Sequence, residues 1–458
     1  MDDAVLAEGV QASPQVARAL EAALTQFLTP VMEWLDTLVD KRLVRTLVAS
    51  IIALLEWRNR AHGLLLSELG AYICDPAHAP AGTKRLSNLL RSPKWEANGL
   101  SLYLWRHATH QLAALETADE TPLLIWDTSV LEKPESLASP DLGAVRSSKA
   151  RRLTHRKPGF YQPPTRPLLV PGWRWIGLLL VGLRGASGPP CVAHMRWWTT
   201  RGPRASDQDW EQREILQVCA QTWRRRVLHI WDRGYAGRAW LDLALAFPLR
   251  FVVRWPKRYQ LLSVRRGVEP VPAWRVAQGL RAWDYRLLWD ARRHVQRRTG
   301  VLAIPVWRRD DLLRQQPLWL VVARRGQGQE PWYLLTSEPV TTAEQAWHIV
   351  YAYARRWQIE WAWRYGKSEL ALESPRVWSW ERRQKFLLLA TLAYAFLLSL
   401  LRDEAQPMRQ WLLGYWCHRT GKRSRAAAAP LYRLRSALSR LWLAYLPSPG
   451  YPIPQNSG

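Results

Sequence analysis

The sequence has few cysteines and no long apolar segment, and these shortages exclude several classes of protein. Its four cysteines, among 458 residues, form no Cys-x-x-Cys pair, which argues against a zinc site or a disulfide framework and favours a reducing compartment. The longest uncharged apolar run, 386–401, has 16 residues, whereas a membrane-spanning helix needs ~20. No signal-peptide pattern follows Met1. We therefore expect a cytoplasmic chain with no membrane partner, in which 386–401 forms a buried helix.

Acidic residues are also scarce, and charge is the strongest signal in the composition. The chain has 38 Asp and Glu against 65 Lys and Arg, a formal net charge of +27. Only 10 of the 65 basic residues are Lys, and the planar guanidinium of Arg suits phosphate groups. A polyanion is thus the natural partner: DNA, RNA or an anionic membrane surface. The basic residues are spread along the chain instead of forming one amphipathic face, which argues against the membrane.

Hydrophobic periodicity divides the chain into five regions, in a mixed α/β order. Residues 1–115 have helical spacing, and Thr83 there is placed to cap a short basic helix that carries Lys84 and Arg85. Such a helix either enters a DNA groove or is simply a solvated face. Residues 116–257 mix strands and helices, and 258–336 are strand-rich. Residues 337–405 are helical, with a long helix from Thr341 or Thr342 to about residue 370, and 406–458 form a helical region with a tail.

Three acidic residues stand out by their positions. Asp127 follows the apolar run Leu-Leu-Ile-Trp, and Asp232 follows Leu-His-Ile-Trp, so each is expected where a buried strand ends. Carboxylates held there on rigid backbone can bind a divalent metal, although an Asp at a strand end often serves as a turn or helix cap. Glu360 lies within the long helix among aromatic and basic residues. It could be a third ligand, or an ion-pair partner of Arg356 or Arg364.

Separated carboxylates in a strongly basic chain fit one reaction class well. Two Mg²⁺ ions bridged by carboxylates can activate a water or a 3′-hydroxyl and stabilise the leaving oxygen of a phosphodiester. The basic surroundings would neutralise the phosphates. The residues alone therefore point to a metal-dependent enzyme acting on nucleic acid.

One spacing in the long helix resembles a known signature. The pattern Tyr353-x2-Arg356-x3-Glu360-x6-Lys367 is similar, residue for residue, to the Y-R-E-K signature of bacterial DDE transposases in the insertion-sequence family numbered four. The segments at 126–128 and 232–235 resemble the two Asp motifs of that family, although many members have two Asp in the first motif. The segment 250–254 resembles the strand after the second motif, and 332–340 the end of an inserted β region. The resemblance covers about 120–400.

The resemblance implies an α/β fold with an RNase H-like catalytic domain. That domain would comprise 116–257 and 337–405, interrupted by a β-rich insertion at 258–336. By position only, 1–115 would be the helical DNA-binding region that reads the terminal inverted repeats. The helical region and tail at 406–458 would support a homodimer in the synaptic complex.

The resemblance also assigns roles to residues. Asp127, Asp232 and Glu360 would be the catalytic triad and would hold two Mg²⁺ ions, which Mn²⁺ could replace. The other expected contacts are with DNA: phosphates of the transposon end for the helix residues, and a stacked extruded base for the tryptophan, unless that tryptophan is only a core residue of a strand. The DNA contacts that the resemblance implies are Tyr353, Arg356, Lys367, Arg254 and Trp332. The basic sequence around them adds Lys149 in a loop, and Lys84 and Arg85 on the short basic helix.

The expected function is a DNA transposase. It would bind the terminal inverted repeats of an insertion sequence and carry out strand cleavage and strand transfer, with hairpin formation on the transposon ends as one route. Two alternatives remain open: a catalytically silent DNA-binding derivative, and a plain metal-dependent nuclease. All three acids are present, which argues against the first, and the N-terminal region and β insertion argue against the second.

Overall fold

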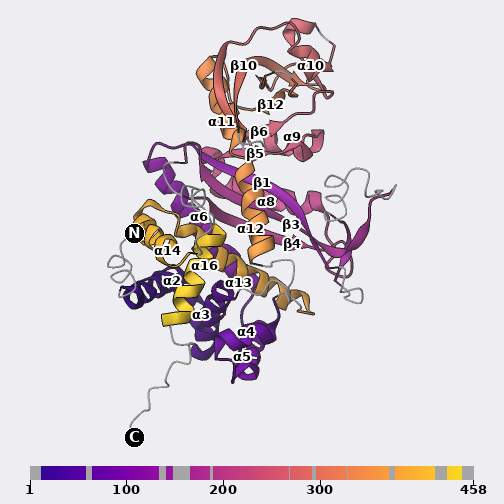
Figure 1. Ribbon diagram of the computed structural model, residues 1–458. Coiled ribbons are helices and arrows are strands. Elements are labelled where there is room, and N and C mark those ends of the chain that lie inside the picture. The colour runs from indigo at the N-terminus through magenta and orange to yellow at the C-terminus, as the bar shows by residue number, and fades with distance from the viewer. Residues whose placement is uncertain are drawn as a thin grey trace.

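A computed structural model gives the fold, and Figure 1 shows a sheet with helices packed on it and a separate helical part. A large sheet occupies the middle and upper parts, and a cluster of helices forms the lower part. The residues that the structure describes are 12–57, 64–133, 141–147, 166–185, 189–267, 269–290, 295–326, 328–370, 377–417 and 431–445.

The helical part combines segments from both ends of the chain. Its N-terminal helices are α2 (Ser13–Asp36), α3 (Lys41–Glu56), α4 (Leu66–Ile73), α5 (Ala79–Arg91) and α6 (Ala97–Thr117). Its C-terminal helices are α13 (Trp380–Ser399), α14 (Gln406–Tyr415) and α16 (Leu431–Tyr445). Helix α13 contacts α3, α5, α6 and α16 and is buried along most of its length, so the prediction of a buried helix at 386–401 is confirmed.

The start of α5 differs from the prediction, and the described helices can be tested for a membrane span. Helix α5 begins at Ala79, so Thr83 is not its cap: the Thr83 hydroxyl lies inside the helix and donates to the carbonyl of Ala79 at 2.8 Å. Among the described helices, none alone is long and apolar enough to cross a membrane, and the one pair that passes that test together, α13 with 403–415, is bent by 78°.

The sheet has twelve strands. The first six are β1 (Pro122–Glu132), β2 (Gly143–Arg146), β3 (Leu169–Gly182), β4 (Cys191–Trp198), β5 (Leu228–Trp231) and β6 (Arg250–Arg254). The others are β7 (Gln260–Leu262), β8 (Val271–Pro272), β9 (Asp284–Asp290), β10 (Val295–Arg308), β11 (Leu318–Arg324) and β12 (Trp332–Thr336). Strands β4, β3 and β1 are antiparallel neighbours, whereas β1, β5 and β6 run parallel.

Among the described residues, one pairing joins the strands within 258–336 to the rest of the sheet. Strand β12 pairs antiparallel with β6, so the sheet continues from β6 through β12, β11 and β10 into the upper part of the molecule. The fold is therefore mixed α/β with helical flanks, as the sequence predicts, and its described strands form one large sheet.

The two faces of the sheet bury different helices. Alternate residues of a strand point to opposite faces. On β1, Leu124 and Trp126 belong to the core formed with α6, α8 (Gln208–Thr222) and α9 (Arg238–Ala246). Leu123 and Ile125 belong to the opposite core, which includes the helices that follow residue 343. The odd-numbered residues of β1 therefore face the C-terminal helices.

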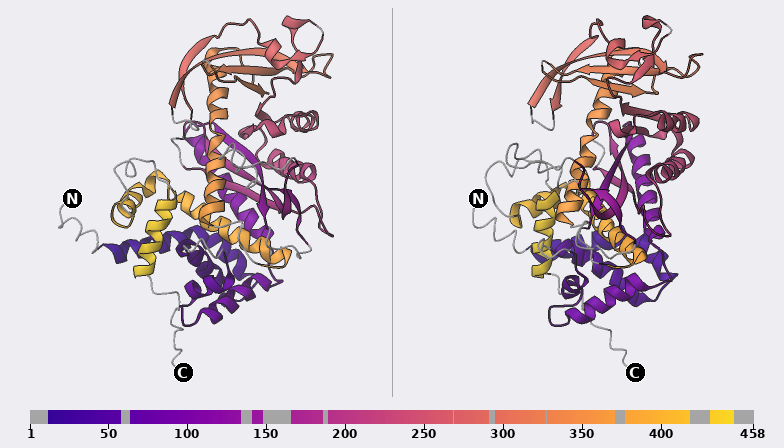
Figure 2. Two further views of the ribbon diagram at one scale, coloured as in Figure 1. Left: turned by 45° about the vertical axis from the view of Figure 1, so that its right-hand side comes forward. Right: turned by 90° about the vertical axis from the view of Figure 1, so that its right-hand side faces the viewer.

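The long helix predicted from Thr341 or Thr342 to about residue 370 is in fact two helices. Helix α11 (Ala343–Ala354) begins at a capping box between Thr342 and Gln345, and α12 (Trp357–Glu369) follows a break at 355–356. Helix α11 packs beside β10, β11 and β12, and α12 runs from there across β1 towards the helical part (Figure 2). The break lies four residues before Glu360, so it sets the direction in which that residue is presented.

Candidate active site

Strand register places the two aspartates side by side. Strands β1 and β5 are parallel neighbours, with Leu123 opposite Leu228 and Ile125 opposite Ile230. Two residues further along each strand stand Asp127 and Asp232. Neighbouring strands lie about 4.8 Å apart, so the two carboxylates leave adjacent backbones at the same level. The sequence alone could not show this, because it does not say which strands pair.

Strand β1 does not end at Asp127, which corrects the prediction. It continues to Glu132 because β3 pairs with it throughout, whereas β5 stops at Trp231. Asp127 is therefore a half-buried mid-strand residue, at the point where β1 loses its β5 neighbour. Asp232 is also half-buried, and its Oδ1 accepts the backbone N–H of Gly234 at 2.7 Å. The capping role weighed for Asp232 is thus present, with Oδ1 occupied.

Both aspartates face the side of the sheet that α12 covers. The strand partner of Asp127 is Gly177, and a Cβ built on Gly177 would meet the Trp363 ring of α12 at 2.3 Å. Directly opposed residues of an antiparallel pair point to the same face, so the Asp127 side chain points towards α12. Asp232 has the parity of Leu228 and Ile230 on β5, which share that core.

A buried tyrosine lies near both carboxylates. Burial raises the pKa of Tyr235 well above its ordinary value, and the negative charges of Asp127 and Asp232 raise it further. A Coulomb effect of both carboxylates on one phenol requires that both lie within its neighbourhood.

Glu360 is carried over the same face by α12. Its neighbour Ile359 is fully buried, and Trp363, one turn further on, packs edge-to-face on Trp175 of β3 with ring centroids 5.1 Å apart. The Glu360 carboxylate accepts from Nη2 of Arg356 at 2.6 Å. The ion pair considered as an alternative role for Glu360 is therefore present, with Arg356 as the partner.

Arg356 is a buried cation between several acceptors. Its side chain is 10% exposed, and its guanidinium carbon lies 4.8 Å from the ring centroid of Trp357. Burial alone would lower the pKa of Arg356, but the Tyr353 hydroxyl and the carboxylates of Glu360 and Asp232 outweigh burial and raise it. Arg356 thus keeps its charge while it lies near two of the three predicted metal ligands.

The three carboxylates fit a hard divalent cation by chemistry, but they are not gathered around one point. Carboxylate oxygens are the ligands that Mg²⁺ prefers. Within the described residues, however, no three acidic, His or Cys side chains lie close enough together to hold one ion. Asp127 and Asp232 are adjacent, whereas Glu360 is bound to Arg356. The three acids are therefore the right kind of ligand for the ion, but the third, Glu360, is hydrogen-bonded to Arg356.

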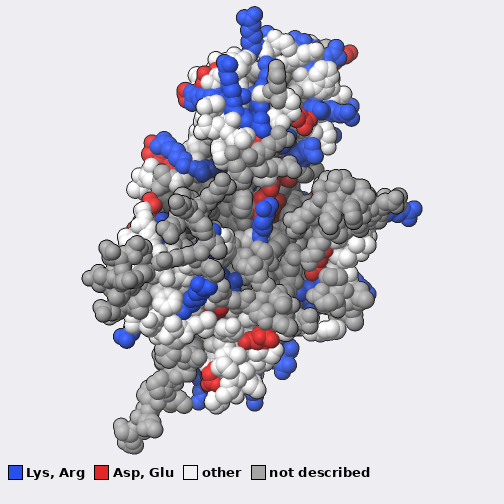
Figure 3. Space-filling model, viewed as in Figure 1, with Lys and Arg blue, Asp and Glu red and all other residues white. Residues whose placement is uncertain are grey.

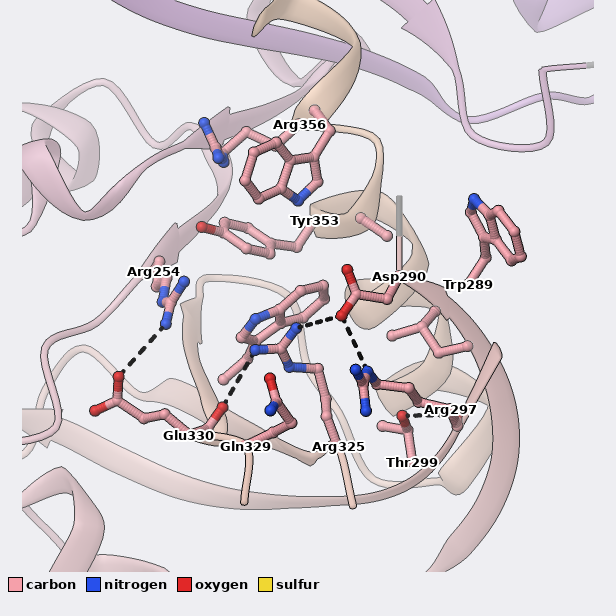
Figure 4. A pocket seen from close by; sticks show the side chains of 14 residues that line it. Arg254, Trp289, Asp290, Arg297, Thr299, Arg325, Gln329, Glu330, Tyr353 and Arg356 are labelled. Carbon is pink, nitrogen blue, oxygen red and sulfur yellow. Dashed lines mark hydrogen bonds and ion pairs between the residues drawn. The ribbon is translucent and has the colours of Figure 1, made fainter. Parts of the chain in front are cut away.

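A basic and aromatic cavity adjoins this site. It has a volume of about 280 Å³, and it gathers four of the residues that the sequence assigns to DNA contact. Figure 4 labels three of them, Arg254, Tyr353 and Arg356, around the cavity. The four are Arg254, Trp332, Tyr353 and Arg356.

Trp332 lies in the wall of this cavity. Its side chain is only 5% exposed, its ring carries the Arg325 guanidinium at 4.5 Å from the centroid, and the Tyr353 ring packs against it at 5.2 Å. The core role considered for Trp332 thus has direct support in the packing. Stacking on a base would require Arg325 to leave the ring face.

Cations outnumber acids along the cavity wall. Asp290 pairs with Arg297 at 3.0 Å and reaches Arg325 at 4.0 Å, while Glu330 lies 4.0 Å from Arg254. Lys257 also binds Glu330, at 3.0 Å. Figure 3 shows Lys and Arg side chains crowded over the same upper part of the molecule, where β10, β12 and α11 lie in Figure 1. The surface around the cavity is suited to an anionic partner.

The other predicted DNA contacts lie far from this cavity or outside the described residues. Lys84 and Arg85 are exposed on α5, at the opposite end of the molecule from β10 and α11 (Figures 1 and 2). Lys367 lies within α12, but its side chain is outside the described part. Lys149 lies outside the described residues altogether.

Several residues of the site escape sequence reasoning. Asp290, Arg297 and Arg325 reach the cavity from β9, β10 and the end of β11, respectively, and no local motif marks them. Gly177 has a readable signal, because an isolated Gly in an apolar strand often marks the close approach of another element. Here that element is Trp363 of α12.

One family model matches part of the chain. Residues 211–396 match the family model of the transposase DDE domain, a segment that includes Asp232 and Glu360 and begins after Asp127. No curated protein matches the sequence. Among solved structures, a cryo-EM structure of a piggyBac transposase synaptic complex with hairpin DNA is similar at 9% identity, with 88% of this chain and 70% of that chain covered and a TM-score of 0.41. The family match supports a DDE transposase domain over this part of the chain.

Proposed function

We propose that this protein is a DNA transposase of the Y-R-E-K subgroup in the insertion-sequence family numbered four. It binds the terminal inverted repeats of its element, cleaves the strands there and joins the ends to target DNA. The observation that carries the proposal is the register of β1 and β5, which sets Asp127 and Asp232 side by side beneath the helix that bears Glu360.

The strand order supports an RNase H-like catalytic domain. Along the sheet the order is β4, β3, β1, β5 and β6, so β1 lies in the centre. On one side β3 and β4 follow in antiparallel pairings, and on the other side β5 and β6 run parallel to β1. We propose that these strands with α11 and α12 form that domain, and that β7 to β12 form the insertion. The helical segments 1–115 and 406–458 serve end recognition and the synaptic homodimer, in a bacterial cytoplasm at the nucleoid.

The metal requirement follows from the donor set. Asp127 and Asp232 would hold Mg²⁺, or Mn²⁺ in its place, and Glu360 would complete the set once it is separated from Arg356. Bound ions supply activation of the attacking water or 3′-hydroxyl and charge stabilisation at the leaving oxygen. The chain itself does the positioning: Arg254 and Arg356 bind phosphates of the end, and α12 holds Glu360 above the two aspartates.

The cavity offers a place for a base next to those phosphates. Trp332 has a flat face there, and aromatic faces accept any base. If Arg325 withdraws to a phosphate, an extruded base can occupy its place over the ring, which is the arrangement that hairpin formation on the transposon end would need. The extruded base is thus part of the proposal for Trp332.

The test is cleavage of a duplex that carries the element's own inverted repeat. Wild type should cut at the repeat boundary with Mg²⁺ or Mn²⁺ and not with EDTA, and Glu360→Ala should abolish the cuts. Glu381→Ala is the matched control, because Glu381 is an exposed acid on α13 outside the site. Specific binding without cuts would instead favour a silent DNA-binding derivative, and cuts without regard to the repeat would favour a plain nuclease.

A further inference from the structure

The contact between Arg356 and Glu360 has the features of an exchangeable ion pair. The two residues are four apart at the start of α12, with Nη2 and Oε1 at 2.6 Å. The Arg356 side chain is 10% exposed and that of Glu360 is 33% exposed, so the carboxylate is open to a new partner. The Nε of Arg356 is buried and has no hydrogen-bond partner among the described residues. An unused buried donor leaves this guanidinium able to bind a further acceptor.

A metal ion and Arg356 compete for the same carboxylate. Glu360 is the third acid on the α12 side of the sheet, and with Glu360 bound to Arg356 no three acidic, His or Cys side chains among the described residues lie close enough together to hold an ion. While Glu360 binds Arg356, only Asp127 and Asp232 remain as an adjacent pair. Two carboxylates hold Mg²⁺ or Mn²⁺ less tightly than three, because affinity rises with the number of charged ligands.

Arg356 also belongs to the cavity that would receive DNA. Arg254 and Tyr353 also line that cavity, and Figure 4 shows Arg356 at the cavity edge with Tyr353 between it and Arg254. A phosphate is a better partner for a guanidinium than one carboxylate oxygen, because it can accept two parallel N–H bonds. The buried Nε and one Nη could supply that pair of donors.

We infer that Arg356 is a positioning residue that withholds Glu360 from Asp127 and Asp232 until a DNA phosphate takes over its guanidinium. The inference rests on the proposed function, since it takes these three acids as the metal ligands. It makes metal affinity and DNA binding mutually dependent: the same exchange that anchors the transposon end completes the metal site. Without DNA, the metal site would lack its third ligand, which protects other DNA from cleavage.

The experiment measures Mn²⁺ binding to the full chain by the loss of the free-ion EPR signal, with and without a duplex that carries the inverted repeat. Binding to the duplex alone is subtracted. The wild type should bind Mn²⁺ about tenfold more tightly with DNA than without, the size expected for release from a partly buried ion pair. Arg356→Gln should bind at the tighter level without DNA. Arg364→Gln, which changes the exposed Arg on the other side of Glu360, should behave as wild type.

Further variants separate the possible failures. Arg356→Lys keeps a positive charge but loses the planar set of donors, so its Mn²⁺ affinity without DNA should lie between those of wild type and Arg356→Gln. This variant replaces Arg356→Gln in the test if Arg356→Gln does not fold. Glu360→Gln should remove the effect of DNA and of Arg356→Gln together. An unchanged or weaker Mn²⁺ affinity in a folded Arg356→Gln chain would overturn the inference while leaving the transposase proposal intact. If Asp127→Asn leaves Mn²⁺ binding unchanged in every background, the proposed metal site itself is wrong, and the inference with it.

Discussion

The two aspartates and the glutamate reach the same place by different means. Asp127 and Asp232 are fixed by backbone pairing between β1 and β5, so their relative position follows from the hydrogen-bond register. Glu360 depends on the packing of α12 on the sheet and on one ion pair. The comparison teaches that the strand-borne half of the site is rigid, whereas its helix-borne half can be adjusted by a side chain and by a ligand.

The largest expected effect comes from removal of a strand-borne acid. Asp127→Ala or Asp232→Ala should lower the rate of cleavage by about a thousandfold or more, because a metal site contributes several kcal/mol of charge stabilisation and each 1.36 kcal/mol is tenfold. Binding to the transposon end should stay nearly intact in a gel-shift measurement. Glu360→Ala should lose cleavage to the same extent. Loss of end binding in any of the three variants would contradict the role of these acids as metal ligands.

The next effect tests how α12 is seated. Gly177→Ala should destabilise the fold by about 1–3 kcal/mol, because the new Cβ would lie 2.3 Å from the Trp363 ring and something must shift. Cleavage should fall with it, since Trp363 shares the helix face of Glu360. Denaturant unfolding gives the free energy, and Gly237→Ala, at a Gly with open space around it, is the control.

A double variant sharpens the same point. Trp363→Leu removes the ring that the Gly177→Ala methyl would meet, so the combined variant should lose less stability than the sum of the two single losses. Additive losses would mean that the two residues do not touch.

A smaller effect concerns the rigidity of the strand pair. Nδ1 of His229 on β5 accepts the indole N–H of Trp126 on β1 at 3.1 Å, on the face opposite the aspartates. Burial lowers the pKa of His229 to about 3, so the folded chain binds fewer protons than the unfolded chain below pH ~6.5. Its stability should therefore decrease as the pH falls from 6.5, by at most about 1.4 kcal/mol per pH unit from this residue.

His229→Gln checks that prediction. Gln keeps an acceptor for the indole but does not titrate, so the free energy of unfolding should depend less on pH between 6.5 and 4 than in wild type. An identical pH dependence in the two chains would mean that His229 is not held neutral.

The smallest effect concerns single phosphate contacts. Arg254→Ala should weaken end binding and reduce the slope of log K against log salt by roughly 0.9, the value for one phosphate. Lys367→Ala should do the same. Arg281→Ala, at an exposed Arg outside the cavity, should leave the slope unchanged. A slope that does not move with Arg254 would place the DNA elsewhere.

The sequence predicts the local elements well where one factor decides them. The runs before Asp127 and Asp232 are strands, the apolar run at 386–401 lies in a buried helix, and 258–336 is rich in strands. The prediction fails where neighbouring elements decide where a strand or helix ends. Strand β1 continues past Asp127 because β3 pairs along it, and the long helix divides at 355–356, where no Pro or Gly marks a break.

The same division applies to the site. By itself, the sequence determined which residues could act: two aspartates after apolar strands, and a helix with Tyr353, Arg356, Glu360 and Lys367 at fixed spacing. Only the tertiary structure decided which of them meet. Strand pairing brings together residues 105 apart in the chain, and packing at Gly177 brings α12 above them. Spacing along a chain fixes contacts within a helix or strand, whereas contacts between elements depend on register and packing, which no local pattern records.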